Sequence, residues 1–208
     1  MKSSFDLTLY LVTDPSAGEK TEEIVKEAVA GGVTMVQLRE KTAGSLSFYE
    51  RALRLKRVTR KAGVPLIIND RTDIMLAADA DGLHVGQSDL PAAVARRLIG
   101  PDKILGVSAH TVEEAVRAEK DGADYLGVGA VFPTATKKDA ESVSYETLKE
   151  ICETVSIPVV AIGGIGEHNI GKLVGSGIRG IAVVSAIMNA ENSEKQSYIL
   201  KNEINQIL

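Results

Sequence analysis

Short apolar runs alternate with longer amphipathic segments along the chain, and this alternation occurs eight times. Runs such as Val159-Val160-Ala161-Ile162 predict buried strands, because strands covered on both faces are nearly continuous in apolar residues. The expected strands cover residues 7–13, 33–38, 66–69, 82–85, 104–108, 125–129, 159–162 and 180–184. The expected helices cover residues 21–30, 45–61, 72–78, 91–98, 111–120, 144–155, 168–175 and 194–207.

Glycines mark many of the boundaries between these elements. Gly63, Gly122 and Gly177 each follow a helical stretch and precede a strand, as glycines at helix C-termini do. Eight strand–helix units without an intervening linker predict an α/β protein, a single-domain (β/α)8 TIM barrel over residues 1–208. An open doubly wound sheet is the alternative. Its first strand is normally followed by a glycine-rich phosphate loop, whereas Thr13-Asp14-Pro15 ends the first strand here.

Composition narrows the possible functions. Among 208 residues, 44% are hydrophobic and 25% are charged, which is ordinary for a packed domain. The net charge of −4 and the lack of a long basic tract argue against nucleic-acid binding. No apolar run approaches the roughly 18–20 residues that span a bilayer. A single cysteine, Cys152, precludes an intramolecular disulfide, so we expect a cytoplasmic protein. The oligomeric state stays open, a homo-oligomer included.

The run Gln37-Leu38-Arg39-Glu40-Lys41 lies where the second strand should end. Side chains alternate between the faces of a strand, so Gln37, Arg39 and Lys41 share one face while Leu38 faces a packed layer. Guanidinium and ammonium groups bind phosphate oxygens well. The shared face therefore predicts a cradle for a polyanion, with a solvated charged strand end as the alternative.

Polar or glycine-rich groups follow seven consecutive predicted strands, counted from the second. Barrel enzymes place their active sites at these carboxyl ends. Beyond residues 37–41, the groups are Asn69 and Asp70, residues 86–89, Ser108 and His110, residues 132–138, Gly163 and Gly164, and Val184 and Ser185. The repetition predicts one active site on one rim, with small molecules as its partners.

Asp70 and Asp89 follow adjacent strands, so their carboxylates can approach each other. Two carboxylates without a cysteine or histidine cluster suit Mg²⁺, which takes one or two carboxylates together with substrate phosphates. Each aspartate could instead cap the helix that follows it. Their pairing on neighbouring strands favours a magnesium site.

A second anion site is expected across the barrel mouth. Gly163 and Gly164 allow close backbone approach, and Ser185 can start a helical turn whose amides bind phosphate. A tight turn is the alternative for the glycines. The loop at residues 132–138 lies between the two anion sites and predicts a lid. His84 is expected to be a hydrogen-bonded interior residue, whereas His110 could either reach the site or cap a helix.

Six segments, taken in this order and spacing, resemble the thiamine-phosphate synthase (thiamine-phosphate pyrophosphorylase) family. They are Gln37-Leu38-Arg39-Glu40-Lys41, Ile68-Asn69-Asp70, His84-Val85-Gly86-Gln87-Ser88-Asp89, Gly106-Val107-Ser108-Ala109-His110-Thr111, Pro133-Thr134-Ala135-Thr136-Lys137 and Ile162-Gly163-Gly164-Ile165. The resemblance runs from Leu9 to Ile187.

This resemblance implies condensation of 4-amino-5-hydroxymethyl-2-methylpyrimidine diphosphate with 4-methyl-5-(2-phosphoethyl)thiazole, or its carboxylated tautomer, to thiamine phosphate and pyrophosphate. It implies a dissociative, Mg²⁺-assisted displacement. By the same resemblance, the pyrimidine diphosphate is held by Gln37, Leu38, Arg39, Glu40, Lys41, Asn69, Ser108 and Lys137. The metal is held by Asp70 and Asp89, and the thiazole phosphate by Thr134, Ala135, Thr136, Gly164, Val184 and Ser185. Catalytic roles fall to Arg39, Lys41, Ser108 and Lys137.

Two alternatives share the barrel. A related thiazole tautomerase tends to lack the glutamine, the second acidic position and the Thr-x-Thr-Lys pattern, which are present here as Gln37, Asp89 and residues 134–137. A non-catalytic binder of phosphate esters would rarely need the paired aspartates. The sequence therefore favours the synthase.

Overall fold

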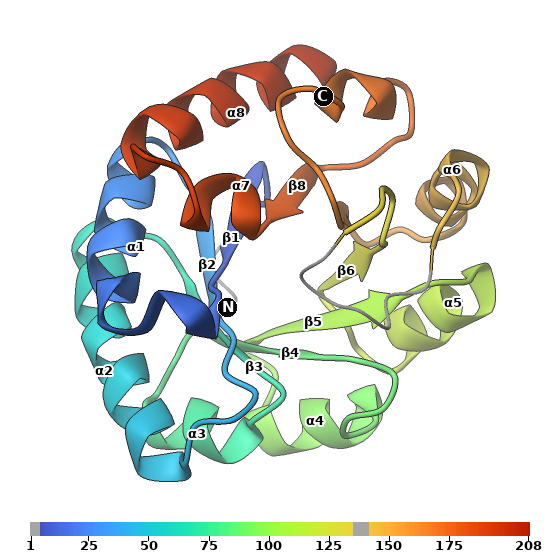
Figure 1. The fold of residues 1–208 in the computed structure, drawn as a ribbon. Helices are drawn as coiled ribbons and strands as arrows, with labels where there is room; N and C mark the ends of the chain where they lie inside the picture. The colour runs from blue at the N-terminus through green and yellow to red at the C-terminus, as the bar shows by residue number, and fades with distance from the viewer. Residues whose placement is uncertain (1–4, 135–141) are drawn as a thin grey trace.

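The computed structural model describes residues 5–134 and 142–208, which form a closed barrel of eight parallel strands (Figure 1). Each strand pairs with the next, and β1 also pairs with β8 through the register Leu9↔Ile181. The strands are β1 Leu9–Val12, β2 Met35–Leu38, β3 Leu66–Asn69, β4 Gly82–Val85, β5 Ile104–Ala109, β6 Tyr125–Val128, β7 Val159–Ile162 and β8 Gly180–Val183. The predicted (β/α)8 barrel is confirmed, and the pairing of β1 with β8 rules out an open sheet.

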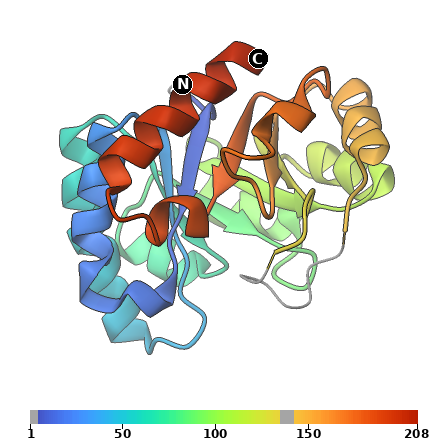
Figure 2. The same ribbon diagram turned by 45° about the horizontal axis from the view of Figure 1, so that its top comes forward.

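Helices surround the strands on the outside of the barrel (Figure 1). They are α1 Thr21–Ala30, α2 Ser45–Lys61, α3 Thr72–Ala77, α4 Ala92–Ile99, α5 Val112–Lys120, α6 Tyr145–Thr154, α7 Ser185–Met188 and α8 Ser193–Ile207, with the 3-10 segments η1 Pro15–Lys20 and η2 Ile170–Leu173. The last helix, α8, packs against α1 and β1 and completes the ring (Figure 2). Across the described part of the chain, no helix has the length and apolar character needed to cross a membrane.

The helix predicted at residues 168–175 is wrong, because only the short η2 forms there. Asn169 ties this segment back to the preceding loop. Its Oδ1 accepts from the Gly166 amide at 2.9 Å, and its Nδ2 donates to the Gly164 carbonyl at 2.9 Å. These bonds hold the chain in a loop that continues from β7. Ser185 begins the short helix α7, as predicted.

Two apolar layers flank the strands, as the nearly continuous apolar runs predicted. On β1, Leu9 and Leu11 pack outward against the helices, while Tyr10 and Val12 point into the barrel. The barrel interior is filled by Leu7, Tyr10, Val12, Met35, Ile67, Ile104, Tyr125, Val160 and Ala182. These side chains close the barrel below the carboxyl ends of the strands.

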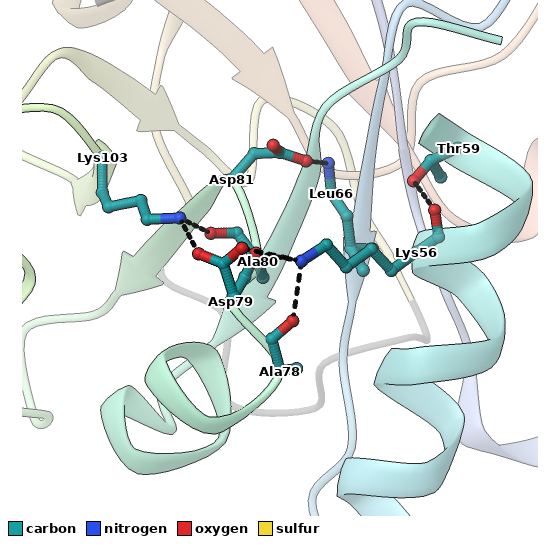
Figure 3. A network of polar contacts seen from close by, with 8 residues as sticks. All are labelled: Lys56, Thr59, Leu66, Ala78, Asp79, Ala80, Asp81 and Lys103. Carbon is teal, nitrogen blue, oxygen red and sulfur yellow. Dashed lines mark hydrogen bonds and ion pairs between the residues drawn. The ribbon is translucent and has the colours of Figure 1, made fainter. Parts of the chain in front are cut away.

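A polar network joins elements at the amino-terminal end of the barrel (Figure 3). Asp79 has Lys56 Nζ at 3.0 Å from its Oδ2 and Lys103 Nζ at 2.6 Å from its Oδ1. Both lysines also donate to backbone carbonyls near Asp79. The hydrogen bonds from Lys103 and Lys56 lower the pKa of Asp79 to about 2. The network ties α2 to the turns before β4 and β5, so its charged groups serve the fold.

Candidate active site

A pocket of about 630 Å³ opens at the carboxyl ends of the strands, and residues from all eight strands or the loops after them line it. The predicted site residues that line it are Gln37, Arg39, Lys41, Asn69, Asp70, Asp89, Ser108, Thr134, Gly164, Val184 and Ser185. Ala135, Thr136 and Lys137 lie outside the described residues. A second hollow of about 710 Å³ lies at the opposite end, where Lys56, Asp79 and Lys103 contribute to its wall. These groups are paired with one another, so we place the chemistry in the first pocket.

The end of β2 presents alternate side chains to this pocket, as predicted. Gln37, Arg39 and Lys41 line it. Leu38 does not, because its side chain is fully buried in the layer against the helices. Glu40 does not either, because its carboxylate pairs with Arg51 of α2. Those two residues therefore support the strand end, and their side chains do not reach the pocket.

The two aspartates lie next to each other in the pocket. The Lys41 ammonium is 2.5 Å from the Asp70 carboxylate, and the Asp89 carboxylate accepts from the Gly86 amide at 2.8 Å. Desolvation raises the pKa of Asp89, and the hydrogen bond and negative charge of neighbouring Asp70 raise it further. The structure thus confirms that the two carboxylates approach each other.

The alternative role of these aspartates as helix caps is not what the structure shows. Arg71 is the N-cap residue of α3, and Pro91 is the N-cap residue of α4. Asp70 instead occupies a left-handed backbone conformation with φ of 61°, which aspartate tolerates better than most residues. Its amide donates to the His84 carbonyl at 2.8 Å, which fixes the β3 end against β4.

The donor set of this pair fits Mg²⁺. Within residues 5–134 and 142–208, no group of three or more histidine, cysteine, aspartate or glutamate side chains could hold a metal. Mg²⁺ does not require such a group, since it often takes one or two carboxylates and completes its shell with water and substrate phosphates. Two carboxylates that disfavour each other's charge are stabilised by a divalent cation between them. The pair is therefore a suitable partial ligand set.

The glycines after β7 are required by both backbone and packing. Gly163 has φ of 104° and Gly164 has φ of 64°. A Cβ on Gly164 would lie 2.4 Å from the Pro133 carbonyl oxygen, and one on Gly163 would lie 2.5 Å from Ala130 Cα. The Phe132 amide also donates to the Gly163 carbonyl at 3.1 Å. The loops after β6 and β7 therefore lie directly against each other at the pocket.

The floor of the pocket holds a buried chain of side-chain hydrogen bonds. Gln37 Nε2 donates to Tyr10 Oη at 2.7 Å, and Tyr10 Oη lies 2.8 Å from Tyr125 Oη. His84 Nδ1 is 3.0 Å from Tyr125 Oη, and His84 Nε2 is 2.9 Å from Ser108 Oγ. The prediction that His84 is a hydrogen-bonded interior residue is confirmed. Neither tyrosine was predicted as part of the site.

Burial keeps the ionisable side chains of this hydrogen-bond chain uncharged. Desolvation lowers the pKa of His84 to about 4, with a smaller opposing effect from Asp89. Desolvation also raises the pKa of both the Tyr10 and the Tyr125 hydroxyls above the ordinary value. Around neutral pH, the floor therefore consists of uncharged donors and acceptors.

Two further polar residues line the wall. Asn69 is buried, and its Nδ2 has no hydrogen-bond partner in the part of the chain that the structure describes. Buried donors are normally satisfied, so this amide is suited to meet a ligand oxygen. His110 lines the pocket while its Nδ1 lies 3.1 Å from Glu114 Oε2, and Glu114 also accepts from the His110 amide at 2.8 Å. Of the two roles that the sequence left open, His110 has the first: it reaches the pocket, while Thr111 is the N-cap residue of α5.

A model of a known protein family, described as thiamine monophosphate synthase, matches residues 9–187. The chain belongs to this family. A thiamine-phosphate synthase of Ruminiclostridium cellulolyticum is 61% identical over 194 residues, 92% of each chain. A thiamine-phosphate synthase of Clostridium botulinum is 54% identical over 209 residues, 100% of this chain and 98% of the relative.

Solved structures agree with this family. A thiamine phosphate pyrophosphorylase from Pyrococcus furiosus superposes with a TM-score of 0.90 at 43% identity, covering 97% of both chains. The resemblance inferred from the six segments is confirmed, and with it the prediction of a transferase of the thiamine-phosphate synthase type. These relatives bear the synthase name, which favours the synthase over the tautomerase.

Proposed function

We propose that the pocket condenses 4-amino-5-hydroxymethyl-2-methylpyrimidine diphosphate with 4-methyl-5-(2-phosphoethyl)thiazole, or its carboxylated tautomer, into thiamine phosphate and pyrophosphate. The observation that carries this proposal is the arrangement of two anion-binding ends in one pocket. Cations and carboxylates gather at β2, β3 and β4, while the glycine loop after β7 and the start of α7 line the other side. In the closed strand order, β3 and β4 lie across the barrel from β7 and β8.

The diphosphate belongs at the β2–β4 side. Arg39 can bind phosphate oxygens with two parallel hydrogen bonds, and Lys41 adds a compact positive charge. The unpartnered amide of Asn69 can donate to a phosphate oxygen. Asp70 and Asp89 would hold Mg²⁺, which when bound would neutralise charge on the diphosphate. The position of these side chains in the lining of the pocket supports each assignment.

The thiazole phosphate belongs at the β7–β8 side. Gly164, Val184 and Ser185 line the pocket there, and Thr134 approaches from the neighbouring loop after β6. The close contact between the loops after β6 and β7 brings these groups to one end of the pocket. We assign Ala135 and Thr136 to the same ligand from the sequence.

The reaction would proceed by dissociation. The bond between the pyrimidine methylene carbon and the diphosphate oxygen breaks, and both electrons leave with pyrophosphate. The thiazole nitrogen then donates its lone pair to the resulting methylene cation and forms the new carbon–nitrogen bond. Arg39 and Lys41 stabilise the departing charge. Ser108 contributes from the floor, and Lys137, assigned from the sequence, would close over the leaving group as part of a lid.

This reaction requires no protein nucleophile. Cys152 is unsuited to that role because it lies on α6, and desolvation raises the pKa of its thiol to about 11. We further propose that residues 1–208 act as one catalytic domain in the cytoplasm. A single cysteine, which cannot form an intramolecular disulfide, supports that location.

The decisive experiment incubates the protein with both substrates and Mg²⁺ and measures thiamine phosphate and pyrophosphate. We expect both products in equal amounts, and none when either substrate is omitted or the metal is chelated. Conversion of the carboxylated thiazole without the pyrimidine would instead identify a tautomerase. Binding of phosphate esters without any product would identify a non-catalytic binder.

A further inference from the structure

The hydrogen-bond chain in the pocket floor runs across the barrel interior. It joins Gln37 on β2 to Ser108 on β5 through Tyr10, Tyr125 and His84. Tyr10 and Tyr125 are among the largest fully buried side chains, and both belong to the interior layer. Gln37 and Ser108 also line the pocket. Tyr10 and His84 border the pocket as well, while Tyr125, at the centre of the chain of hydrogen bonds, does not line it.

The orientation of the Gln37 amide shows the direction of every bond in this chain of hydrogen bonds. Its Nε2 can only donate, so Tyr10 Oη accepts this bond. A hydroxyl has one proton, and the Tyr10 proton has Tyr125 Oη as its partner. Tyr125 in turn gives its proton to His84 Nδ1. With the Gln37 amide in this orientation, any other assignment would leave a buried hydroxyl proton without an acceptor.

The tautomer of His84 follows from this direction. Since Nδ1 accepts, the neutral imidazole carries its proton on Nε2 and donates to Ser108 Oγ. Ser108 then keeps its own proton for an acceptor in the pocket. At the other end, Gln37 is anchored through Nε2, so its carbonyl oxygen is available as an acceptor. The Ser108–His84 pair therefore differs from a nucleophile with its general base, because the imidazole is the donor.

We propose that Tyr10, Tyr125 and His84 are positioning residues that set the hydrogen-bond polarity of the pocket floor, so that Gln37 selects a ring bearing an amino donor. The inference rests on the proposed function, because it assumes that Gln37 faces the pyrimidine substrate. A 4-amino group can donate to the Gln37 carbonyl oxygen. A 4-oxo group at the same place would bring a second acceptor oxygen against the Gln37 carbonyl oxygen, and no hydrogen bond could form between them. The two buried tyrosine hydroxyls thus determine this specificity through the orientation of the Gln37 amide.

Nitrogen-15 NMR of the labelled histidines tests the direction of the chain without any turnover. The protein has three histidines. The variants His110→Gln and His168→Gln each remove one set of signals, which assigns the remaining signals to His84. We expect His84 to be protonated on Nε2 and unprotonated on Nδ1 near neutral pH. In Tyr125→Phe, Nδ1 loses its donor, so the preference for this tautomer should weaken. A wild-type His84 protonated on Nδ1, or on both nitrogens, would overturn the proposal.

Ligand discrimination tests the other end of the chain. Titration calorimetry with Mg²⁺, and without the thiazole, compares the pyrimidine diphosphate with its 4-oxo analogue. We expect the wild-type protein to prefer the amino compound by roughly 5- to 150-fold, the factor that one unmatched buried hydrogen-bonding group costs. Tyr10→Phe frees the Gln37 amide to rotate, so the preference should fall several-fold. Its His84 tautomer should stay unchanged, because Tyr125 still donates to Nδ1.

For Tyr125→Phe we expect a larger effect, a reversal of the ligand preference. Tyr10 would then satisfy its proton only by donating to the Gln37 carbonyl, which turns the amide nitrogen toward the ligand. The preference should therefore shift toward the 4-oxo analogue. Phe5→Leu is the matched control, because Phe5 packs edge-on against Tyr125 with ring centroids 6.1 Å apart but lies outside the chain of hydrogen bonds. It should change neither the tautomer nor the preference.

Two outcomes separate the possible failures. If both tyrosine variants and the control lower affinity for the two pyrimidines equally, the tyrosines have only a structural role and the proposal is wrong. If the predicted tautomer is found but no pyrimidine diphosphate binds, the proposed function fails and the selection of an amino ring fails with it. The direction of the chain would then still hold. Circular dichroism of each variant shows whether the barrel is folded before either comparison is made.

Discussion

Gly164→Ala tests whether the glycine after β7 is needed for close approach or only for its backbone angle. The residue lines the pocket and has φ of 64°. A Cβ there would lie 2.4 Å from the Pro133 carbonyl oxygen and 2.9 Å from the Phe132 carbonyl oxygen. Both neighbours are backbone atoms, so no flexible side chain can move aside. The substitution must therefore displace one of the two loops.

Gly63→Ala is the matched control. Gly63 has φ of 69°, close to that of Gly164, but a Cβ there would meet nothing within 4 Å. It follows α2 at the opposite end of the barrel. Both substitutions lower the free energy of unfolding by roughly 1–2 kcal/mol, because they place an L-residue in the left-handed region. Both also gain about 0.4–1 kcal/mol from a less flexible unfolded chain. Only Gly164→Ala adds the cost of overpacking, about 1–3 kcal/mol.

We expect Gly164→Ala to melt about 2–12 °C below Gly63→Ala, since each kcal/mol shifts Tm by about 2–4 °C in a chain of this size. Displacing the loop should also raise the KM for the thiazole phosphate more than the KM for the pyrimidine diphosphate. Thermal unfolding and steady-state kinetics measure the two effects. Equal melting temperatures for both variants, with an unchanged KM for the thiazole phosphate, would refute the reasoning.

Four further outcomes are expected. Asp89→Asn should abolish Mg²⁺-dependent turnover in a folded barrel, and an unchanged response to limiting Mg²⁺ would contradict the metal assignment. Arg39→Ala should weaken pyrimidine diphosphate binding far more than thiazole phosphate binding, whereas equal losses in separate titrations would mean that the two anion sites are not distinct. Lys137→Ala should slow the chemical step by roughly 10²–10³-fold in single-turnover kinetics; a wild-type chemical rate would make it a binding residue only. Asp79→Asn should lower stability by about 0.5–1 kcal/mol, a value reduced for the exposure of this side chain. Because the pKa of Asp79 is about 2 in the folded protein and 3.8 as a free group, this loss should be full above pH 4 and vanish toward pH 2. Denaturant unfolding across that range measures it, and a loss independent of pH would argue against the ion pairs.

The barrel and most of its rim follow from local patterns. Apolar runs separated by amphipathic segments predict parallel strands, and parallel strands necessarily place their carboxyl ends together. Arg39, Asp70 and Ser108 could therefore be assigned to one pocket before any contact was known. The helix predicted at residues 168–175 failed because Asn169 bonds to the loop before it. Side-chain bonds of this kind leave no trace in the hydrophobic pattern.

The roles of Leu38 and Glu40 show a second limit. The alternation of the strand already placed Leu38 in the packed layer, and the structure agrees. Glu40 was assigned to a ligand together with its neighbours, yet it pairs with Arg51 on α2. An ion pair between a strand end and the following helix depends on how the two elements pack. The sequence therefore identified the segment but could not separate the residues that line the pocket from those that support it.

The pocket floor was the part least open to prediction. Tyr10 and Tyr125 each lie in an apolar strand, where an aromatic residue is most simply explained as core packing. Their hydroxyls meet only because β1 and β6 both direct these side chains into the interior of the closed barrel, although the two residues are 115 positions apart in the sequence. The hydrophobic periodicity of the sequence does not predict a contact between two residues so far apart in the chain. Yet this contact decides which nitrogen of His84 carries a proton and which end of the Gln37 amide faces the ligand. In a closed barrel, the interior layer of side chains is also the floor of the active site. Residues that the sequence pattern assigns to the core can therefore control the ligand selectivity of the polar residues above them.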